Sequence, residues 1–163
     1  MLKKMLIACI TLVMLLFTSV GFAANANEYE PAIAVAKAEV PAGAVLYRID
    51  DDKDDADVSL TFYDGGTLLS YEVEVVKATN KVKEVEIKGS NLPGSTRINK
   101  TQAEIRDIVL AEYPDAQNVD IEIETEGNLR YYEVEFSTSK YVKVELKINP
   151  VTGAICKREL KYF

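Results

Sequence analysis

The sequence predicts an α+β protein of two tandem repeats, each with one helix packed on a four-stranded antiparallel sheet. Apolar and polar residues alternate over many short segments, which is the pattern of strands with one buried and one wet face. Two motifs also recur in the same order: Ala38-Glu39-Val40-Pro41 returns as Ala111-Glu112-Tyr113-Pro114, and Tyr71-Glu72-Val73-Glu74-Val75 aligns with Val144-Glu145-Leu146-Lys147-Ile148. A helix end and a strand that recur together indicate a duplicated unit.

The second repeat has the clearer elements. Thr101-x-x-Glu104 is a capping-box pattern, and Pro114 ends the helix that it starts. We expect the stripe of Ile105, Ile108 and Val109 to pack on Val134, Phe136, Val144 and Leu146. The residues predicted to face the core are Val119, Ile121 and Ile123 in one strand, Tyr132, Val134 and Phe136 in the next, and Val142, Val144, Leu146 and Ile148 in the third.

In the first repeat, Pro31 suits an opening helical position and Pro41 stops the helix. Asp64-Gly65-Gly66, and Gly127-Asn128 in the second repeat, are hairpin signals. The expected strands of the first repeat are Val45–Ile49, Val58–Tyr63, Leu69–Val76 and Val82–Lys88. Each sheet would then end on an open edge, in the second repeat the strand around Cys156.

The N-terminus has the pattern of a secretory signal peptide. Lys3 and Lys4 precede an apolar run, and Ala24-Asn25-Ala26 offers a cleavage site. An uncleaved anchor helix is the alternative, because the run could span a bilayer. We expect residues 1–26 to be removed, 27–90 to form the first repeat, 91–97 a linker and 98–163 the second repeat. The product would be periplasmic or extracellular, without stable membrane insertion after cleavage.

Composition excludes several function classes. The chain has 26 acidic and 19 basic residues, a net charge of −7, and the signal peptide would take only positive charge away. Such a chain lacks the cationic surface that nucleic acids and anionic lipids require. It contains no histidine and no glycine-rich phosphate loop, so a Ser-His-Asp site or a His-ligated zinc site cannot be built. We therefore expect no enzyme activity and no cofactor, with Cys156 a buried small residue.

The acidic segment from Asp50 to Asp57 is a candidate metal site. Asp50, Asp52 and Asp54 could gather Ca²⁺, but the segment lacks the glycine and the final glutamate of an EF-hand loop. A solvated loop kept soluble by self-repulsion is the favoured interpretation.

The polar side of the strands is a candidate binding surface. Tyrosine is enriched at interfaces, and Tyr131 shares its side of the strand with charged residues. An acidic surface of this kind would favour a basic partner. The alternative is a wet face that only discourages aggregation. The candidate binding residues are Tyr131, Glu133, Glu135, Lys143, Glu145 and Lys147; Tyr47, Tyr63 and Tyr141 are expected to be partly exposed.

The repeated motifs resemble the PepSY domain, in two tandem copies. The helix ending Ala-Glu-x-Pro, the Tyr-Glu-Val-Glu-Val strand and the turn Asn149-Pro150-Val151-Thr152-Gly153 carry the resemblance. Asn149 stands where the family turn has aspartate, and the first copy has Val76 and Asn80 at the aspartate and glycine positions. Asparagine tolerates the left-handed conformation that the glycine position requires.

The resemblance implies an architecture similar to β-lactamase inhibitory protein and a role in peptidase inhibition or regulation. It supplies no catalytic residues. The leading hypothesis is an exported, non-enzymatic module that binds a protein or peptide, with a peptidase as the candidate partner. The alternatives are a structural or scaffold protein of the cell envelope and a weak calcium-binding protein.

Overall fold

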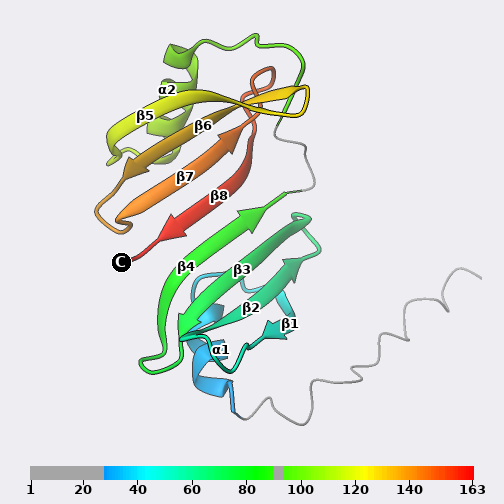
Figure 1. The fold of residues 1–163 in the computed structure, drawn as a ribbon, viewed down its shortest axis with the longest axis vertical. Coiled ribbons are helices and arrows are strands. Elements are labelled where there is room, and N and C mark those ends of the chain that lie inside the picture. Colours follow the sequence, from blue (N-terminus) through cyan, green and yellow to red (C-terminus); the bar gives the residue numbers. More distant parts are fainter. Residues whose placement is uncertain (1–27, 90–93) are drawn as a thin grey trace, which may run out of the picture. The chain divides into compact units, whose positions relative to one another are not determined.

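The computed structural model describes residues 28–89 and 94–163 (Figure 1). The predicted signal peptide lies outside the described residues. So do residues 90–93, which are the last residue of the predicted first repeat and the start of the predicted linker. Within the described residues no helix is long and apolar enough to cross a membrane. The elements are α1 (Glu30–Lys37), β1 (Val45–Asp50), β2 (Asp57–Asp64), β3 (Leu69–Val76), β4 (Lys81–Lys88), α2 (Gln102–Glu112), β5 (Gln117–Glu126), β6 (Leu129–Ser137), β7 (Lys143–Ile148) and β8 (Ile155–Lys161).

The strands form one antiparallel sheet of eight, in the order β1-β2-β3-β4-β8-β7-β6-β5. The sequence predicts two sheets of four, and the difference lies at β4 and β8. These strands pair from Glu84 opposite Lys161 to Lys88 opposite Lys157. Without this pairing, each strand would present unpaired backbone N–H and C=O groups at the edge of its sheet. Pairing β4 with β8 satisfies these groups on both strands. The predicted edge strand around Cys156 is therefore wrong, because β8 lies inside the sheet between β4 and β7.

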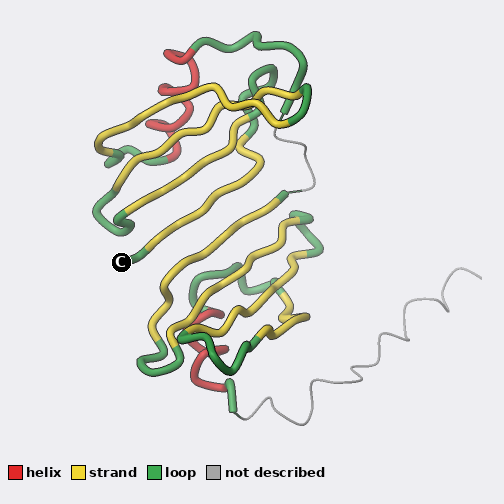
Figure 2. Tube along the Cα trace, in the orientation of Figure 1, coloured by secondary structure: helices red, strands yellow, loops and turns green. Residues whose placement is uncertain are grey.

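The apolar face of the sheet continues across this junction. Cross-strand partners place one buried side chain from each of six neighbouring strands in a single row. Both helices lie behind the strands in the view of Figures 1 and 2, and each buries two residues, Ala32 and Ala36 in α1 and Ile105 and Val109 in α2. The row is Leu60, Val73, Val85, Leu160, Val144 and Phe136.

Local signals place the ends of the elements correctly. Thr101 and Glu104 form the predicted capping box, with the Thr101 amide 2.9 Å from the Glu104 carboxylate. The Asn149 side chain accepts hydrogen bonds from two backbone amides of its turn, both at 3.0 Å, as an aspartate would. Gly153 has a φ of 76°, and Asn80 at the corresponding position has a φ of 51°. The left-handed conformation predicted for Asn80 is confirmed.

Two residues predicted to face the core are exposed. Val142 is 60% exposed because it precedes β7 and belongs to the connection from β6. Ile123 is 44% exposed because its strand, β5, is an edge strand of the sheet. Ile108 and Val119 are half-buried, and the predicted core residues Ile105, Val109, Val134, Phe136, Val144 and Leu146 are all buried.

Candidate binding face

The face of the sheet opposite the helices, here called the polar face, carries a row of carboxylates. Alternation along each strand directs these side chains away from the core, and the antiparallel register aligns one from each of six neighbouring strands. The row continues from β3 to β5 across the β4–β8 junction. It consists of Glu72, Glu86, Glu159, Glu145, Glu135 and Asp120.

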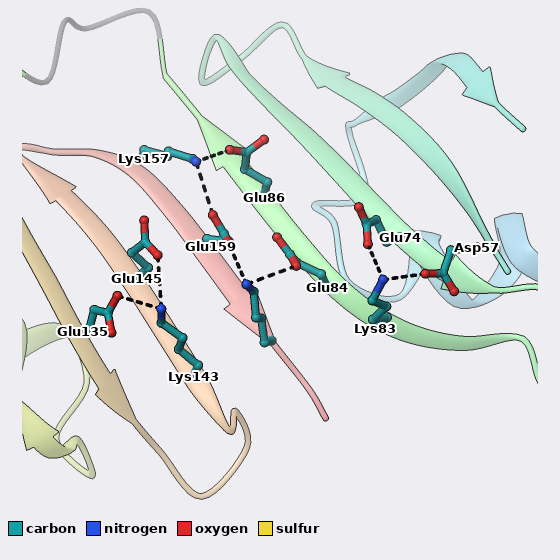
Figure 3. Close-up of polar contacts among 11 residues, drawn as sticks. Asp57, Glu74, Lys83, Glu84, Glu86, Glu135, Lys143, Glu145, Lys157 and Glu159 are labelled. Carbon is teal, nitrogen blue, oxygen red and sulfur yellow. Dashed lines mark hydrogen bonds and ion pairs between the residues drawn. The ribbon is translucent and has the colours of Figure 1, made fainter. Parts of the chain in front are cut away.

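Lysines between the strands offset the repulsion within this row (Figure 3). The Nζ of Lys157 lies 2.5 Å from Glu86 and 3.3 Å from Glu159, so it joins β4 to β8. The Nζ of Lys143 lies 2.7 Å from Glu135 and 3.5 Å from Glu145. Each lysine thus bridges two carboxylates that would repel each other if left alone.

A second set of charges crosses the junction beside this row. The Nζ of Lys161 lies 2.9 Å from Glu159 and 3.8 Å from Glu84. Burial, followed by the nearby charge of Glu159, raises the pKa of Glu84 to about 7. Burial also works against the charge of Glu159, but hydrogen bonds from Lys161 and Lys157 outweigh it and lower the pKa of that carboxyl. The junction therefore contains one carboxyl held ionised and one that titrates near neutral pH.

All six predicted binding residues lie on the polar face, but Tyr131 is not free. Its side chain lies on the same side as Glu133 and Glu135, yet the residue is only 8% exposed. The Nζ of Lys147 covers the Tyr131 ring at 4.6 Å from the centroid and donates a hydrogen bond to its hydroxyl at 3.1 Å. Tyr131 therefore positions Lys147 rather than offering an open aromatic surface.

The β5–β6 end of the polar face is its most acidic part. Asp120, Glu122, Glu133 and Glu135 line an open hollow of about 220 Å³. Burial, followed by the charge of Glu145, raises the pKa of Glu133 above its usual range. This end of the face favours a cationic group from outside the chain over an anionic one.

Both outer strands of the sheet are protected against pairing with another chain. On β5, the carbonyls of Val119 and Ile121 accept hydrogen bonds at 3.1 Å from the side chains of Arg106 and Gln102 of α2. On β1, the register shifts at a bulge around Tyr47. Capped carbonyls and bulges both hinder the addition of a strand. The polar face is therefore better suited to a partner than either edge.

The candidate calcium residues do not converge. Asp50 pairs with Arg48 at 2.7 Å, and Asp52 accepts a hydrogen bond from the backbone amide of Asp54 at 3.2 Å. Lys77 donates to the Asp52 carbonyl at 2.7 Å, which brings a positive charge into the loop. In the described ranges, no three metal-ligating side chains are grouped around a point that could hold an ion.

Comparison with known families bears on the second half of the chain. Residues 100–159, from the residue before the α2 cap into β8, match the PepSY family, described as "Peptidase propeptide and YPEB domain". This part of the chain is therefore similar to a PepSY domain. No curated protein and no solved structure matches the chain. The matched part of the chain contributes β5 to β8 to the polar face, and β1 to β4 supply the remainder.

Sequence reasoning missed the charged residues at the centre of the polar face. Glu84, Glu86, Lys157, Glu159 and Lys161 come from the two strands whose pairing was not predicted. Their alternating positions were visible in the sequence. Their partners were not, because the strands are far apart along the chain and a register between them is decided only when both halves fold.

Proposed function

We propose that this protein is an exported, non-enzymatic binding module that restrains or regulates a peptidase through its polar face. The match of residues 100–159 to the PepSY family carries the proposal, because the description of that family names peptidase propeptides. A propeptide-like module acts by occupying a surface of its peptidase, and it needs no reacting groups of its own. The lack of histidine in the chain agrees with such a role.

The polar face is the proposed contact surface for three physical reasons. The opposite face is buried under the helices, and both edges are protected as described above. The acidic hollow around Glu133 lies within the part of the chain that matches the PepSY family. Its charges would steer a basic surface into place and set the association rate more than the final affinity. Added salt should therefore slow association.

The proposal is tested with a pair of variants that carry the same change in charge. Glu133→Lys with Glu135→Lys reverses charge in the hollow, whereas Asp52→Lys with Asp54→Lys does so in the exposed loop after β1. Immobilised wild-type protein is used to capture peptidases from the culture supernatant. The captured peptidase is then assayed on a peptide substrate with wild type and with each variant.

We expect wild type and the loop variant to inhibit the peptidase, and the hollow variant to lose most of the inhibition. Equal inhibition by both variants would remove the polar face from the proposal. If no peptidase is captured, or the captured peptidase keeps full activity, the regulatory role fails and a scaffold role in the envelope becomes the better hypothesis.

Export is a separate part of the proposal, and it is supported by the pattern of residues 1–26. Mass spectrometry of protein recovered from the periplasm or medium should find Asn27 at the N-terminus. Recovery of only the full-length chain, in membranes, would favour an uncleaved anchor instead.

A further inference from the structure

Two tyrosines and a carboxylate meet where the chain enters β7 and leaves β8. Tyr141 precedes β7 and Tyr162 follows β8, and their rings are 5.1 Å apart at an interplanar angle of 89°. Glu39, which follows α1, accepts a hydrogen bond from the Tyr162 hydroxyl. The Tyr162 backbone amide donates to the carbonyl of Lys83 at 2.9 Å, so the sheet fixes the position of this ring.

The ammonium group of Lys140 lies against all three groups. Its Nζ is 5.1 Å from the Tyr141 ring centroid, 5.3 Å from that of Tyr162 and 3.1 Å from the Glu39 carboxylate. Both ring distances are within the roughly 6 Å over which a cation is attracted to an aromatic face. Proteins recognise choline and methylated lysine with aromatic rings around the cation, and a carboxylate adds charge attraction for an ammonium group.

The walls of this site do not depend on Lys140. The Tyr162–Glu39 hydrogen bond and the contact between the rings are made without it. The Thr138 hydroxyl accepts the backbone amides of Lys140 and Tyr141 at 3.2 and 3.0 Å, which fixes the turn whatever side chain stands at position 140. The Lys140 side chain itself is 55% exposed and can swing into water at little cost.

We propose that Glu39, Tyr141 and Tyr162 form a binding site for the ammonium group of a lysine side chain on a partner protein, which Lys140 fills in the free protein. Lys140 is thus an internal competitor that the partner's lysine displaces. The site uses none of the six candidate binding residues of the polar face, so its test does not depend on the peptidase hypothesis.

The probe is n-butylammonium, titrated at constant ionic strength while the ring signals of Tyr141 and Tyr162 are followed by NMR. Lys140→Ala removes the competitor and should bind the probe at least about five-fold more tightly than wild type, the effect of a weak exposed pair together with its ring contacts. The matched control is Lys53→Ala, which removes an exposed lysine from the loop between β1 and β2. It should bind as wild type does.

Adding Glu39→Gln or Tyr141→Leu to Lys140→Ala should abolish the gain in affinity for n-butylammonium. Two double variants are used so that the test survives if one of them fails to fold. The proposal is overturned if Lys140→Ala binds the probe no more tightly than wild type, if Lys53→Ala gains equally, or if the gain survives both Glu39→Gln and Tyr141→Leu. Tighter binding of n-butylguanidinium than of n-butylammonium would also overturn it, because the site would then select arginine.

Discussion

A methyl group added at Gly153 should destabilise the fold for two separate reasons, the backbone conformation and the close packing on α2. Its φ of 76° lies in the left-handed region, and a Cβ placed there would lie 2.7 Å from Cδ1 of Ile108 in α2 and 3.2 Å from Cε of Lys100. The left-handed conformation costs alanine roughly 1–2 kcal/mol. Overpacking against a helix typically adds about 1–3 kcal/mol. Gly153→Ala should therefore lower the free energy of unfolding by about 2–5 kcal/mol.

Gly127 is the matched control, because its φ of 64° is similar but nothing lies within 4 Å of an added Cβ. Gly127→Ala should lower the free energy of unfolding by only the conformational part, roughly 1–2 kcal/mol. Urea unfolding followed by far-UV circular dichroism measures both, with the slope against urea expected to stay unchanged. Equal losses in the two variants would refute the argument that the Gly153 turn packs closely on α2.

Three further predictions concern the core, the junction and the acidic loop. Val144→Asp buries an unpaired charge and should cost about 3–5 kcal/mol in a urea curve; an unchanged curve would mean that the face of β7 is misassigned. Because the pKa of Glu84 is raised from 4.5 to about 7, the folded state binds this proton more tightly than the unfolded state. The stability of wild type should therefore fall as pH rises through this window, more steeply than that of Glu84→Gln; parallel pH profiles would contradict this. Calorimetry should detect no difference in Ca²⁺ heat between wild type and Asp52→Asn/Asp54→Asn, and a difference would restore the calcium hypothesis.

The polar face shows how far sequence reasoning reaches towards a candidate site. Alternation along a strand assigns Glu133, Glu135 and Lys143 to one side, and the structure agrees. Alternation does not show which side chains of the neighbouring strands cover a given residue. Tyr131 was expected to offer contact area, but Lys147 on the neighbouring strand covers it. Whether a ring on a wet face is free depends on the length and reach of its cross-strand neighbours.

The sequence by itself determined the local structure of this protein. The capping box at Thr101, the left-handed turns at Asn80 and Gly153, and the bounds of the strands within a few residues all follow from interactions between near neighbours in the chain. These features depend on backbone conformation and on spacing of two to four residues. The order of the amino acids is therefore enough to predict these features.

Only the tertiary structure decided how the two halves combine. The pairing of β4 with β8 joins two expected sheets into one and aligns Glu86 with Glu159. The same step brings Glu39, from the end of α1, to Tyr162 near the end of the chain. Alternating strands of similar charge pattern could pair in several ways, and no local interaction selects among them. The selection depends on burying one continuous apolar face and on matching each lysine to its carboxylates, which are properties of the assembled sheet.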